Sequence, residues 1–150
     1  MKNIALLIIF TMMSLSFSGC RQTEPREEWA IVIHGGAGSA RSMAPEVRDN
    51  YLELLDQALA VGTEMLINGA EALDVATQVV VWMEDCPAFN AGKGAVVTSD
   101  GIHELDAAVM DGSNLMAGAV AGVRDIKNPI LAARHVMEDS PHVLLIGEGA

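Results

Sequence analysis

The feature that most constrains the fold is a compact apolar run that ends in a glycine-rich turn. Residues 29–33 read Trp-Ala-Ile-Val-Ile, and their β-branched content predicts a buried strand. Residues 34–38 (His-Gly-Gly-Ala-Gly) follow at once and predict a tight turn. Pro45 then opens a long helix, at a position where its missing N–H group costs nothing. A strand, a tight turn and a helix in this order favour a layered domain that contains both helices and strands.

The remainder of the chain continues to alternate helices with strands. Asn68-Gly69 is expected to close the first helix, and the turns at 99–101 and 111–114 join three short strands into a meander. The pattern predicts helices at 45–67, about 72–85 and about 129–139, with strands at 95–98, 102–110, 115–123 and 142–146. Their expected inner faces are Leu52, Leu55, Leu59, Gly62 and Leu66, then Leu73, Ala76, Val80 and Met83, then Ile130, Ala133 and Met137. The predicted fold class is therefore α/β, in an α+β layered arrangement.

The beginning of the chain has the layout of a secretory signal. Lys2 is followed by an apolar run at 4–13 that is too short to span a bilayer, and then by small residues at 14–19. Residues 15–20 (Leu-Ser-Phe-Ser-Gly-Cys) resemble a bacterial lipoprotein signal, which implies a lipid on Cys20. An ordinary cleaved signal with an incidental Cys20 is the alternative. The expected organisation is a signal peptide at 1–19, a tether at 20–28 and a domain at 29–150, exported and membrane-anchored at the periplasmic face.

Charge and cysteine content exclude several classes of function. The chain has 9 Lys+Arg against 20 Asp+Glu, a net charge of −11, which argues against nucleic acid as a partner. Two cysteines in 150 residues do not form a disulfide framework, and Cys86 is interpreted as a buried thiol. The basic residues beyond position 30 are scattered: Arg41, Arg48, Lys93, Arg124, Lys127 and Arg134.

The residues themselves leave the chemistry open. The glycine turn offers backbone N–H groups that could hold an anion, or it is a plain strand–helix connection with His34 as a local hydrogen-bonding partner. The four histidines lack metal-ligand spacing, so a zinc site is not expected. Asp106 and Asp111 could form a carboxylate pair, although turn chemistry explains Asp111 better. Asn90, among small residues, either pins its own loop or orients a substrate.

Five segments in order and spacing resemble one enzyme family. They are 32–38 (Val-Ile-His-Gly-Gly-Ala-Gly), 86–96 (Cys-Pro-Ala-Phe-Asn-Ala-Gly-Lys-Gly-Ala-Val), 103–112 (His-Glu-Leu-Asp-Ala-Ala-Val-Met-Asp-Gly), 117–123 (Ala-Gly-Ala-Val-Ala-Gly-Val) and 128–134 (Asn-Pro-Ile-Leu-Ala-Ala-Arg). Together they resemble the plant-type L-asparaginase and isoaspartyl peptidase family of N-terminal-nucleophile hydrolases. The resemblance covers residues 29–150.

The resemblance implies a four-layer αββα sandwich and a precursor that cuts itself before a threonine. That threonine becomes the N-terminal nucleophile of a second subunit, with its own α-amine as the base, and releases aspartate from asparagine or an isoaspartyl dipeptide. No threonine here occupies a matching position, so this chain is expected to be a truncated first-subunit part with an incomplete sandwich. By itself it is predicted to be inactive and unstable. The complete protein is expected to be a dimer of heterodimers that acts on a small-molecule amide.

Supporting roles carry over to particular residues. His34, Gly35 and Gly36 resemble the loop that borders the nucleophile, and Asn90 resembles a residue that contacts the nucleophile region. No cofactor is expected to be required, but residues 83–93 resemble a sodium-binding loop. The implied sodium ligands are the backbone carbonyls of Met83, Glu84, Cys86, Phe89, Ala91 and Lys93.

Three other interpretations remain open at this point. One is a glycosylasparaginase of the same family. The second is a non-catalytic, truncated lipoprotein that retains part of the fold as a binding module. The third is a small anion-binding domain that uses the glycine turn, which the shortage of nearby basic residues disfavours.

Overall fold

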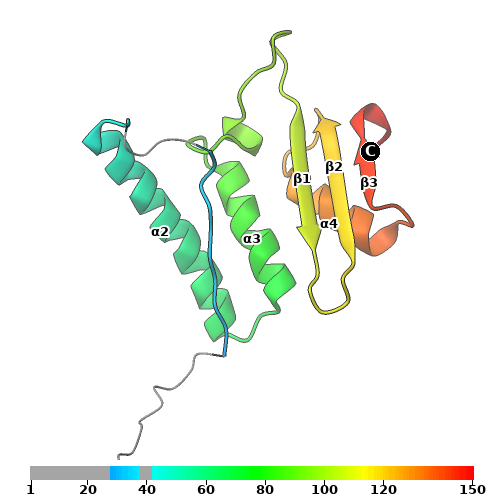
Figure 1. Ribbon diagram of the computed structural model, residues 1–150, viewed down its shortest axis with the longest axis horizontal. Helices are drawn as coiled ribbons and strands as arrows, with labels where there is room; N and C mark the ends of the chain where they lie inside the picture. The colour runs from blue at the N-terminus through cyan, green and yellow to red at the C-terminus, as the bar shows by residue number, and fades with distance from the viewer. Residues whose placement is uncertain (1–27, 38–41) are drawn as a thin grey trace, which may run out of the picture. The chain divides into compact units, whose positions relative to one another are not determined.

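The computed structural model describes residues 28–37 and 42–150 (Figure 1). The chain divides into two units, Met1–Ala30 and Ile31–Ala150. Only residues 28–30 of the first unit are described, and they contain no helix or strand. The predicted signal peptide at 1–19, Cys20 and all but the last residue of the tether lie outside the described residues. Within the described ranges, no helix has the length and apolar character needed to cross a membrane.

Two helices, α2 (Pro45–Ile67) and α3 (Ala72–Asp85), pack against each other in the second unit (Figure 1). Both begin and end where the sequence predicted. Pro45 occupies the first turn of α2, and Asn68 caps its end before Gly69 adopts a φ of 80°, a left-handed conformation that suits glycine. The buried core between the helices consists of Ala58, Val75 and Val79.

The predicted inner faces of these two helices are partly wrong. On α3 the buried apolar residues are Val75 and Val79, whereas Ala76 is exposed. On α2 only Ala58 and Gly62 are buried, and Leu52 is 53% exposed. Both helices carry apolar residues around more than one side, so spacing alone does not identify the side that meets the neighbouring helix.

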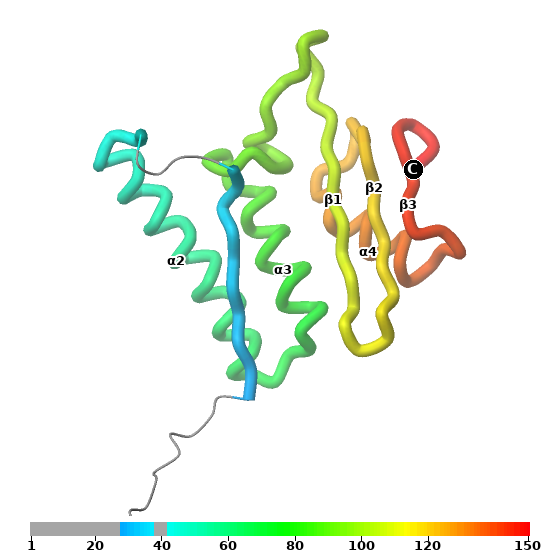
Figure 2. Tube along the Cα trace, viewed as in Figure 1, coloured from blue at the N-terminus to red at the C-terminus, as the bar shows by residue number. Residues whose placement is uncertain are grey.

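The run at 29–33 does not form the predicted strand. Its residues are extended, but none makes ladder hydrogen bonds with another described segment. The alternation expected of a strand is nevertheless present, because Ile31 and Ile33 pack against the α2–α3 core while Val32 is 92% exposed. Figure 2 shows the part of the blue segment that begins at Ile31 running along the two helices. Side-chain burial on the helix pair, and not strand pairing, therefore positions the chain that leads into the glycine turn.

A three-stranded sheet forms the second layer of the unit. Its strands are β1 (Leu105–Met110), β2 (Ala117–Val123) and β3 (Leu144–Ile146), in the order β1-β2-β3. β1 and β2 are antiparallel, whereas β2 and β3 are parallel. The sheet is therefore mixed, and it confirms the predicted α/β class.

The predicted meander is only half correct. Residues 95–98 form no strand, although the turn at 99–101 is present and the Thr98 N–H donates to the Ile102 carbonyl at 2.8 Å. Strand β1 starts three residues later than predicted and β3 two residues later. A short 3₁₀ turn at Gly92–Gly94 precedes residues 95–98, and Ala95 packs against the core under the sheet without pairing with a strand.

Helix α4 (Pro129–Asp139) covers one face of the sheet and connects β2 to β3 (Figure 1). Ile130, Ala133 and Met137 are buried, as predicted. A Cβ added at Gly118 would lie 2.7 Å from the Met137 Cβ and closer still to the α4 backbone, so only glycine permits this approach. The core here comprises Leu105, Val120, Val123, Ala133 and Val136.

Each of the two aspartates of the hairpin accepts a hydrogen bond from a backbone N–H group of the hairpin. Asp106 accepts a hydrogen bond at 2.8 Å from the N–H of Gly122, whose φ of 62° marks an irregularity in the register between β1 and β2. Asp111 accepts at 2.8 Å from the Ser113 N–H in the β1–β2 turn. Hydrogen bonding with the side chain and the backbone of Ser113 holds the pKa of Asp111 below its usual value. The turn interpretation of Asp111 is thus confirmed.

Candidate functional site

A cleft of about 660 Å³ gathers most of the residues that the sequence singled out. It lies where the glycine turn, the first half of α2 and the loop after α3 meet. His34, Gly35, Gly36 and Asn90 all line it, although more than fifty residues separate the turn from the asparagine. Met83, Phe89 and Ala91 of the predicted sodium loop line it as well.

His34 shapes the glycine turn from within. Its Nδ1 accepts a hydrogen bond at 3.2 Å from the N–H of Gly36. An accepting Nδ1 carries no proton, so the proton of the neutral ring is on Nε2. Gly36 has a φ of 107°, a conformation that other residues rarely adopt. The local hydrogen-bonding role predicted for His34 is confirmed.

The buried ring of Phe89 holds the three walls of the cleft together. Phe89 is 3% exposed and meets the Tyr51 ring of α2 edge-on, with the ring centroids 6.1 Å apart. A Cβ added at Gly35 would lie 3.4 Å from the ring of Phe89 and 3.3 Å from Leu55. The turn therefore packs directly on the side chains of Phe89 and Leu55.

Asn90 pins the loop that carries it. Its Oδ1 accepts a hydrogen bond at 2.9 Å from the N–H of Val96. The loop is folded tightly, since a Cβ at Gly92 would lie 2.5 Å from the Glu84 carbonyl oxygen. Of the two roles that the sequence left open for Asn90, the structure shows the loop-pinning one, and its place in the cleft is compatible with the other.

The carbonyls predicted to bind sodium belong to the end of α3 and the loop after it. Four of them already accept a backbone hydrogen bond: Met83 from Cys86 at 3.2 Å, Cys86 from Phe89 at 3.4 Å, Phe89 from Ala91 at 2.8 Å, and Ala91 from Gly94 at 3.0 Å. A carbonyl oxygen has a second lone pair, so these bonds leave acceptor capacity. The described residues include no cluster of three or more His, Cys, Asp or Glu side chains that could hold a metal ion.

The side chain of Glu84 has a structural role, the binding of a backbone N–H group of α4, that the sequence did not reveal. Its Oε1 accepts a hydrogen bond at 3.0 Å from the Ile130 N–H in the first turn of α4, and the residue is 2% exposed. Burial raises the pKa of Glu84, while the hydrogen bond from Ile130 opposes that shift. The carboxylate thus joins the end of α3 to the start of α4.

Asp85 and Cys86, the two residues that follow Glu84, are less buried than Glu84. Asp85 pairs with Lys127 at 2.8 Å, and the hydrogen bond from Lys127 lowers the pKa of Asp85. Cys86 is a free thiol of intermediate burial, so the prediction of a buried thiol is only partly correct.

Arg48 is the residue of the cleft that sequence reasoning missed. It lies one and two helical turns from Leu52 and Leu55, so all three lie on the same side of α2. All three line the cleft, which explains why the predicted inner face of α2 is half exposed at Leu52. Arg48 was visible in the sequence as a cation, but only the fold brings it back to the glycine turn.

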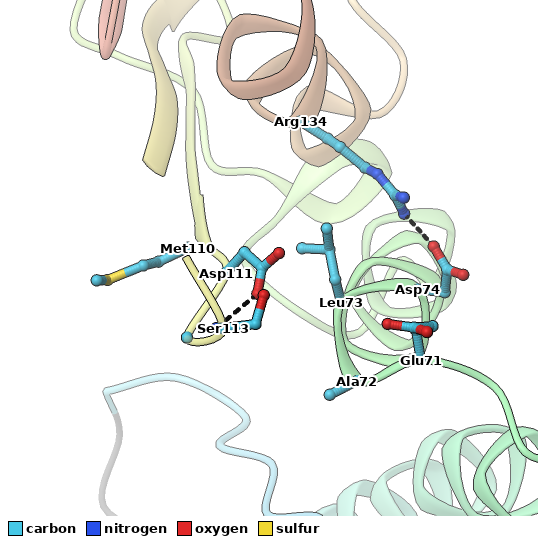
Figure 3. Close-up of a pocket in the computed structure, with 9 residues that line it drawn as sticks. Glu71, Ala72, Leu73, Asp74, Met110, Asp111, Ser113 and Arg134 are labelled. Atoms are coloured by element: carbon cyan, nitrogen blue, oxygen red, sulfur yellow. Dashed lines mark hydrogen bonds and ion pairs between the residues drawn. The ribbon is translucent and has the colours of Figure 1, made fainter. Parts of the chain in front are cut away.

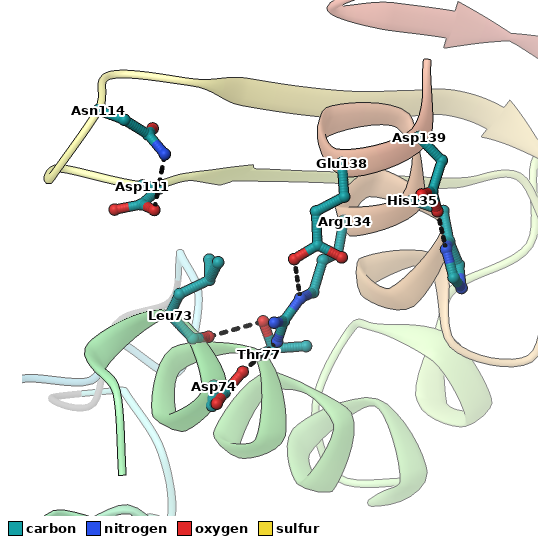
Figure 4. Close-up of polar contacts among 9 residues, drawn as sticks. All are labelled: Leu73, Asp74, Thr77, Asp111, Asn114, Arg134, His135, Glu138 and Asp139. Carbon is teal, nitrogen blue, oxygen red and sulfur yellow. Dashed lines mark hydrogen bonds and ion pairs between the residues drawn. The ribbon is translucent and has the colours of Figure 1, made fainter.

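A second cleft, of about 440 Å³, lies between the start of α3, the β1–β2 turn and α4 (Figure 3). Asp111 and Ser113 face it from the turn, and Arg134 reaches over it from α4 (Figure 3). Arg134 pairs with Asp74 of α3 and Glu138 of its own helix, both at 2.7 Å, as Figure 4 shows. Both carboxylates keep the pKa of Arg134 above its usual value. Arg134 therefore connects α3 to α4, and this cleft contains none of the supporting residues predicted for the site.

Comparison with known proteins agrees with this geometry. A family model described as asparaginase matches residues 27–150. The chain belongs to the asparaginase family. The family resemblance predicted from the five segments is therefore confirmed, and two of those segments contribute residues to the lining of the cleft.

Relatives within the asparaginase family are similar over most of the chain. Isoaspartyl peptidase of Escherichia coli is 57% identical over 122 residues, which is 80% of this chain and 38% of that protein. Plant-type L-asparaginase of Pyrococcus horikoshii is 49% identical over 121 residues, 81% of this chain and 39% of that protein. A probable isoaspartyl peptidase/L-asparaginase of Arabidopsis thaliana is 40% identical over 122 residues. The chain thus spans about two fifths of the length of the curated relatives it matches.

Proposed function

We propose that this chain is the first-subunit part of an amidohydrolase that releases aspartate from asparagine or from an isoaspartyl dipeptide. The observation that carries the proposal is the convergence of His34, Gly35, Gly36 and Asn90 on one cleft. The names of the most similar relatives, isoaspartyl peptidase and plant-type L-asparaginase, favour this branch of the family over a glycosylasparaginase. The nucleophilic threonine would come from a segment outside this chain.

In this proposal the chain's own residues shape the site and leave the bond chemistry to the threonine. The hydrogen bond of His34 and the packing of Gly35 on Phe89 hold the turn next to the cleft. Asn90 holds its loop through Val96, which leaves the two hydrogens of its amide nitrogen to contact the threonine segment or the substrate. Hydrolysis adds one water molecule across the amide, which yields aspartate and either ammonia or the departing amino acid.

We further propose that the missing layers of the αββα sandwich cover the open face of the sheet. Helix α4 occupies one face only. The register places the side chains of Ala108, Met110, Ala117, Ala119, Leu144 and Ile146 on the other face. Met110 is 58%, Leu144 48% and Ile146 65% exposed. A surface this apolar favours burial, which supports a second sheet packed against it and the predicted instability of this part alone.

A structural sodium ion in the loop after α3 remains part of the proposal. The six predicted ligands are backbone carbonyls, and oxygen donors suit a hard alkali cation. The loop begins at the C-terminus of a 14-residue helix, where the helix dipole favours a cation. These residues fit the ion, which would hold the loop that carries Asn90. Thermal unfolding in sodium chloride against choline chloride at equal ionic strength tests this: a lower melting temperature in choline is expected.

Export and lipid attachment also remain proposals. The apolar run at 4–13 and the residues before Cys20 support them. Labelling of cells with a fatty-acid analogue tests the idea, because the Cys20→Ser variant is expected to lose the label. Label retained by the variant would show that Cys20 is incidental.

The function itself is tested by aspartate release from asparagine and from an isoaspartyl dipeptide. The complete protein, meaning this chain joined to its threonine segment, is expected to hydrolyse both, and the 150-residue chain alone neither. Asn90→Ala is expected to lower kcat/KM by about 10²-fold, because the loop at the cleft shifts. Asn114→Ala is the matched control, since Asn114 also accepts one backbone N–H, from Met116 at 2.8 Å, but lies in the β1–β2 turn. An inactive complete protein would favour the non-catalytic alternative.

A further inference from the structure

The charge of the main cleft differs from that of the chain as a whole. Acidic residues outnumber basic ones 20 to 9 in the sequence, yet no Asp or Glu is among the described residues that line this cleft. Arg48 is the one Lys or Arg among those lining residues. The described lining residues therefore include one cation and no anion, and the backbone of the glycine turn lines the same cleft as the guanidinium group of Arg48. This combination suits a carboxylate.

The ion pair that Arg48 makes with Asp49 is weak, so another carboxylate can take the place of Asp49. The guanidinium lies 3.1 Å from Asp49, the next residue along α2. Both side chains are substantially exposed, 45% and 66%, so water screens their attraction. Neighbouring residues on a helix do not face each other, so holding this pair restricts both side chains. A carboxylate that enters the cleft can therefore replace Asp49 with little loss.

The exposure of Arg48 and the volume of the cleft indicate which carboxylate of the substrate would reach Arg48. Arg48 is half exposed, so its guanidinium is open to solvent, whereas the Phe89 ring that lines the same cleft is buried. The volume of about 660 Å³ lies within the usual range of small-molecule sites. An isoaspartyl dipeptide fills more of it than asparagine does, and it carries a second carboxylate on the residue that departs.

We propose that Arg48 binds the carboxylate of the departing residue and so favours isoaspartyl peptides over asparagine. The inference rests on the proposed function, which it deepens by assigning a specificity-determining residue. Asparagine releases ammonia and offers no group to this position. The preference therefore depends on Arg48 only for substrates whose departing part ends in a free carboxylate.

The experiment compares three substrates with the complete protein. They are β-aspartyl-alanine, its C-terminal amide and asparagine. In Arg48→Gln, the ratio of kcat/KM for the free dipeptide to that for asparagine is expected to fall about tenfold, the loss typical of one charged hydrogen bond. The ratio for the amidated dipeptide is expected to stay within about twofold of the wild type, because the carboxylate is already absent. Arg124→Gln is the matched control, since Arg124 is similarly exposed (49%) and paired, with Glu104, but lies outside the cleft.

The outcomes separate this inference from the proposed function. Equal losses on all three substrates, or no loss on any, would overturn the role of Arg48 while the hydrolase assignment stands. A similar selective loss in Arg124→Gln would also overturn it, because the effect would then be one of net charge. A wild-type protein that hydrolyses none of the three refutes the proposed function, and the inference with it. Partial recovery of the dipeptide preference in Arg48→Lys would support it.

Discussion

Replacing Gly94 with alanine tests how strictly the loop at the cleft is folded. A Cβ at Gly94 would lie 2.6 Å from the Pro87 carbonyl oxygen and closer still to that of Phe89. Real Cβ atoms essentially never come within 3.0 Å of such an atom, so the difference between 3.0 and 2.6 Å requires an opening of at least 0.4 Å at Pro87. Both obstacles are backbone atoms, which cannot rotate away as a side chain does. The loop itself therefore has to move, and Asn90 moves with it.

The expected cost follows from that displacement. Overpacking of this kind destabilises a protein by about 1–3 kcal/mol. In a domain of this size each kcal/mol corresponds to about 2–4 °C in melting temperature. Because a shift of about 1 Å at a site can cost about 10²-fold in rate, we expect Gly94→Ala to lower kcat/KM at least about tenfold. The measurements are thermal unfolding and aspartate release, both with the complete protein.

The matched control is Gly112→Ala in the β1–β2 turn. Gly112 has no neighbouring atom within 4 Å of an added Cβ and does not adopt a positive φ. Its substitution is expected to leave both the melting temperature and kcat/KM close to those of the wild type. If Gly94→Ala and Gly112→Ala behave alike, the loop is more compliant than its contacts imply, and the argument that it positions Asn90 is refuted.

Three further predictions concern the junctions between elements. Gly118→Ala is expected to push α4 away from β2 and to cost about 1–3 kcal/mol of stability, seen as a lower midpoint in urea unfolding; an unchanged midpoint would show that the helix can shift freely. Glu84→Ala leaves the buried N–H of Ile130 without its acceptor and is expected to cost about 1–3 kcal/mol, whereas Glu84→Gln retains the acceptor and loses less; equal losses would contradict the capping role. Asp111 has a lowered pKa, so its carboxylate stabilises the fold at pH values above the ordinary pKa of an aspartate and loses that effect as the pH falls through the folded-state pKa. The melting temperature of Asp111→Asn is therefore expected to lie below that of the wild type at neutral pH and to approach it under acid, and a constant gap would refute the linkage.

Local sequence signals were sufficient for the helices. Pro45 and Pro129 start α2 and α4. Asn68 caps the end of α2, and Gly69 then adopts the left-handed conformation that lets the chain turn away. These are short-range effects of backbone geometry, so they hold regardless of what surrounds the helix. The turn at 111–114 was predictable for the same reason, because the Asp111 side chain bonds to the backbone two residues on.

Strands were harder to predict because they need a partner that lies elsewhere in the chain. The run at 29–33 has the composition of a strand but packs its isoleucines on helices, and residues 95–98 follow a 3₁₀ turn without pairing with a strand. The predicted inner face of α2 failed for a related reason. Leu52 and Leu55 line a cleft, and apolar spacing does not distinguish a cleft wall from a core.

The residue types and their order already identified the family, the glycine turn and Asn90, because each depends on short motifs that local chemistry requires. The tertiary structure alone decided which of them meet. It placed Arg48 in the wall of the same cleft as the glycine turn, packed Phe89 against Tyr51 and Gly35, and used the Glu84 side chain to join α3 to α4. These contacts join segments far apart in the chain, and they form because burying Phe89 and the helix faces brings those segments together.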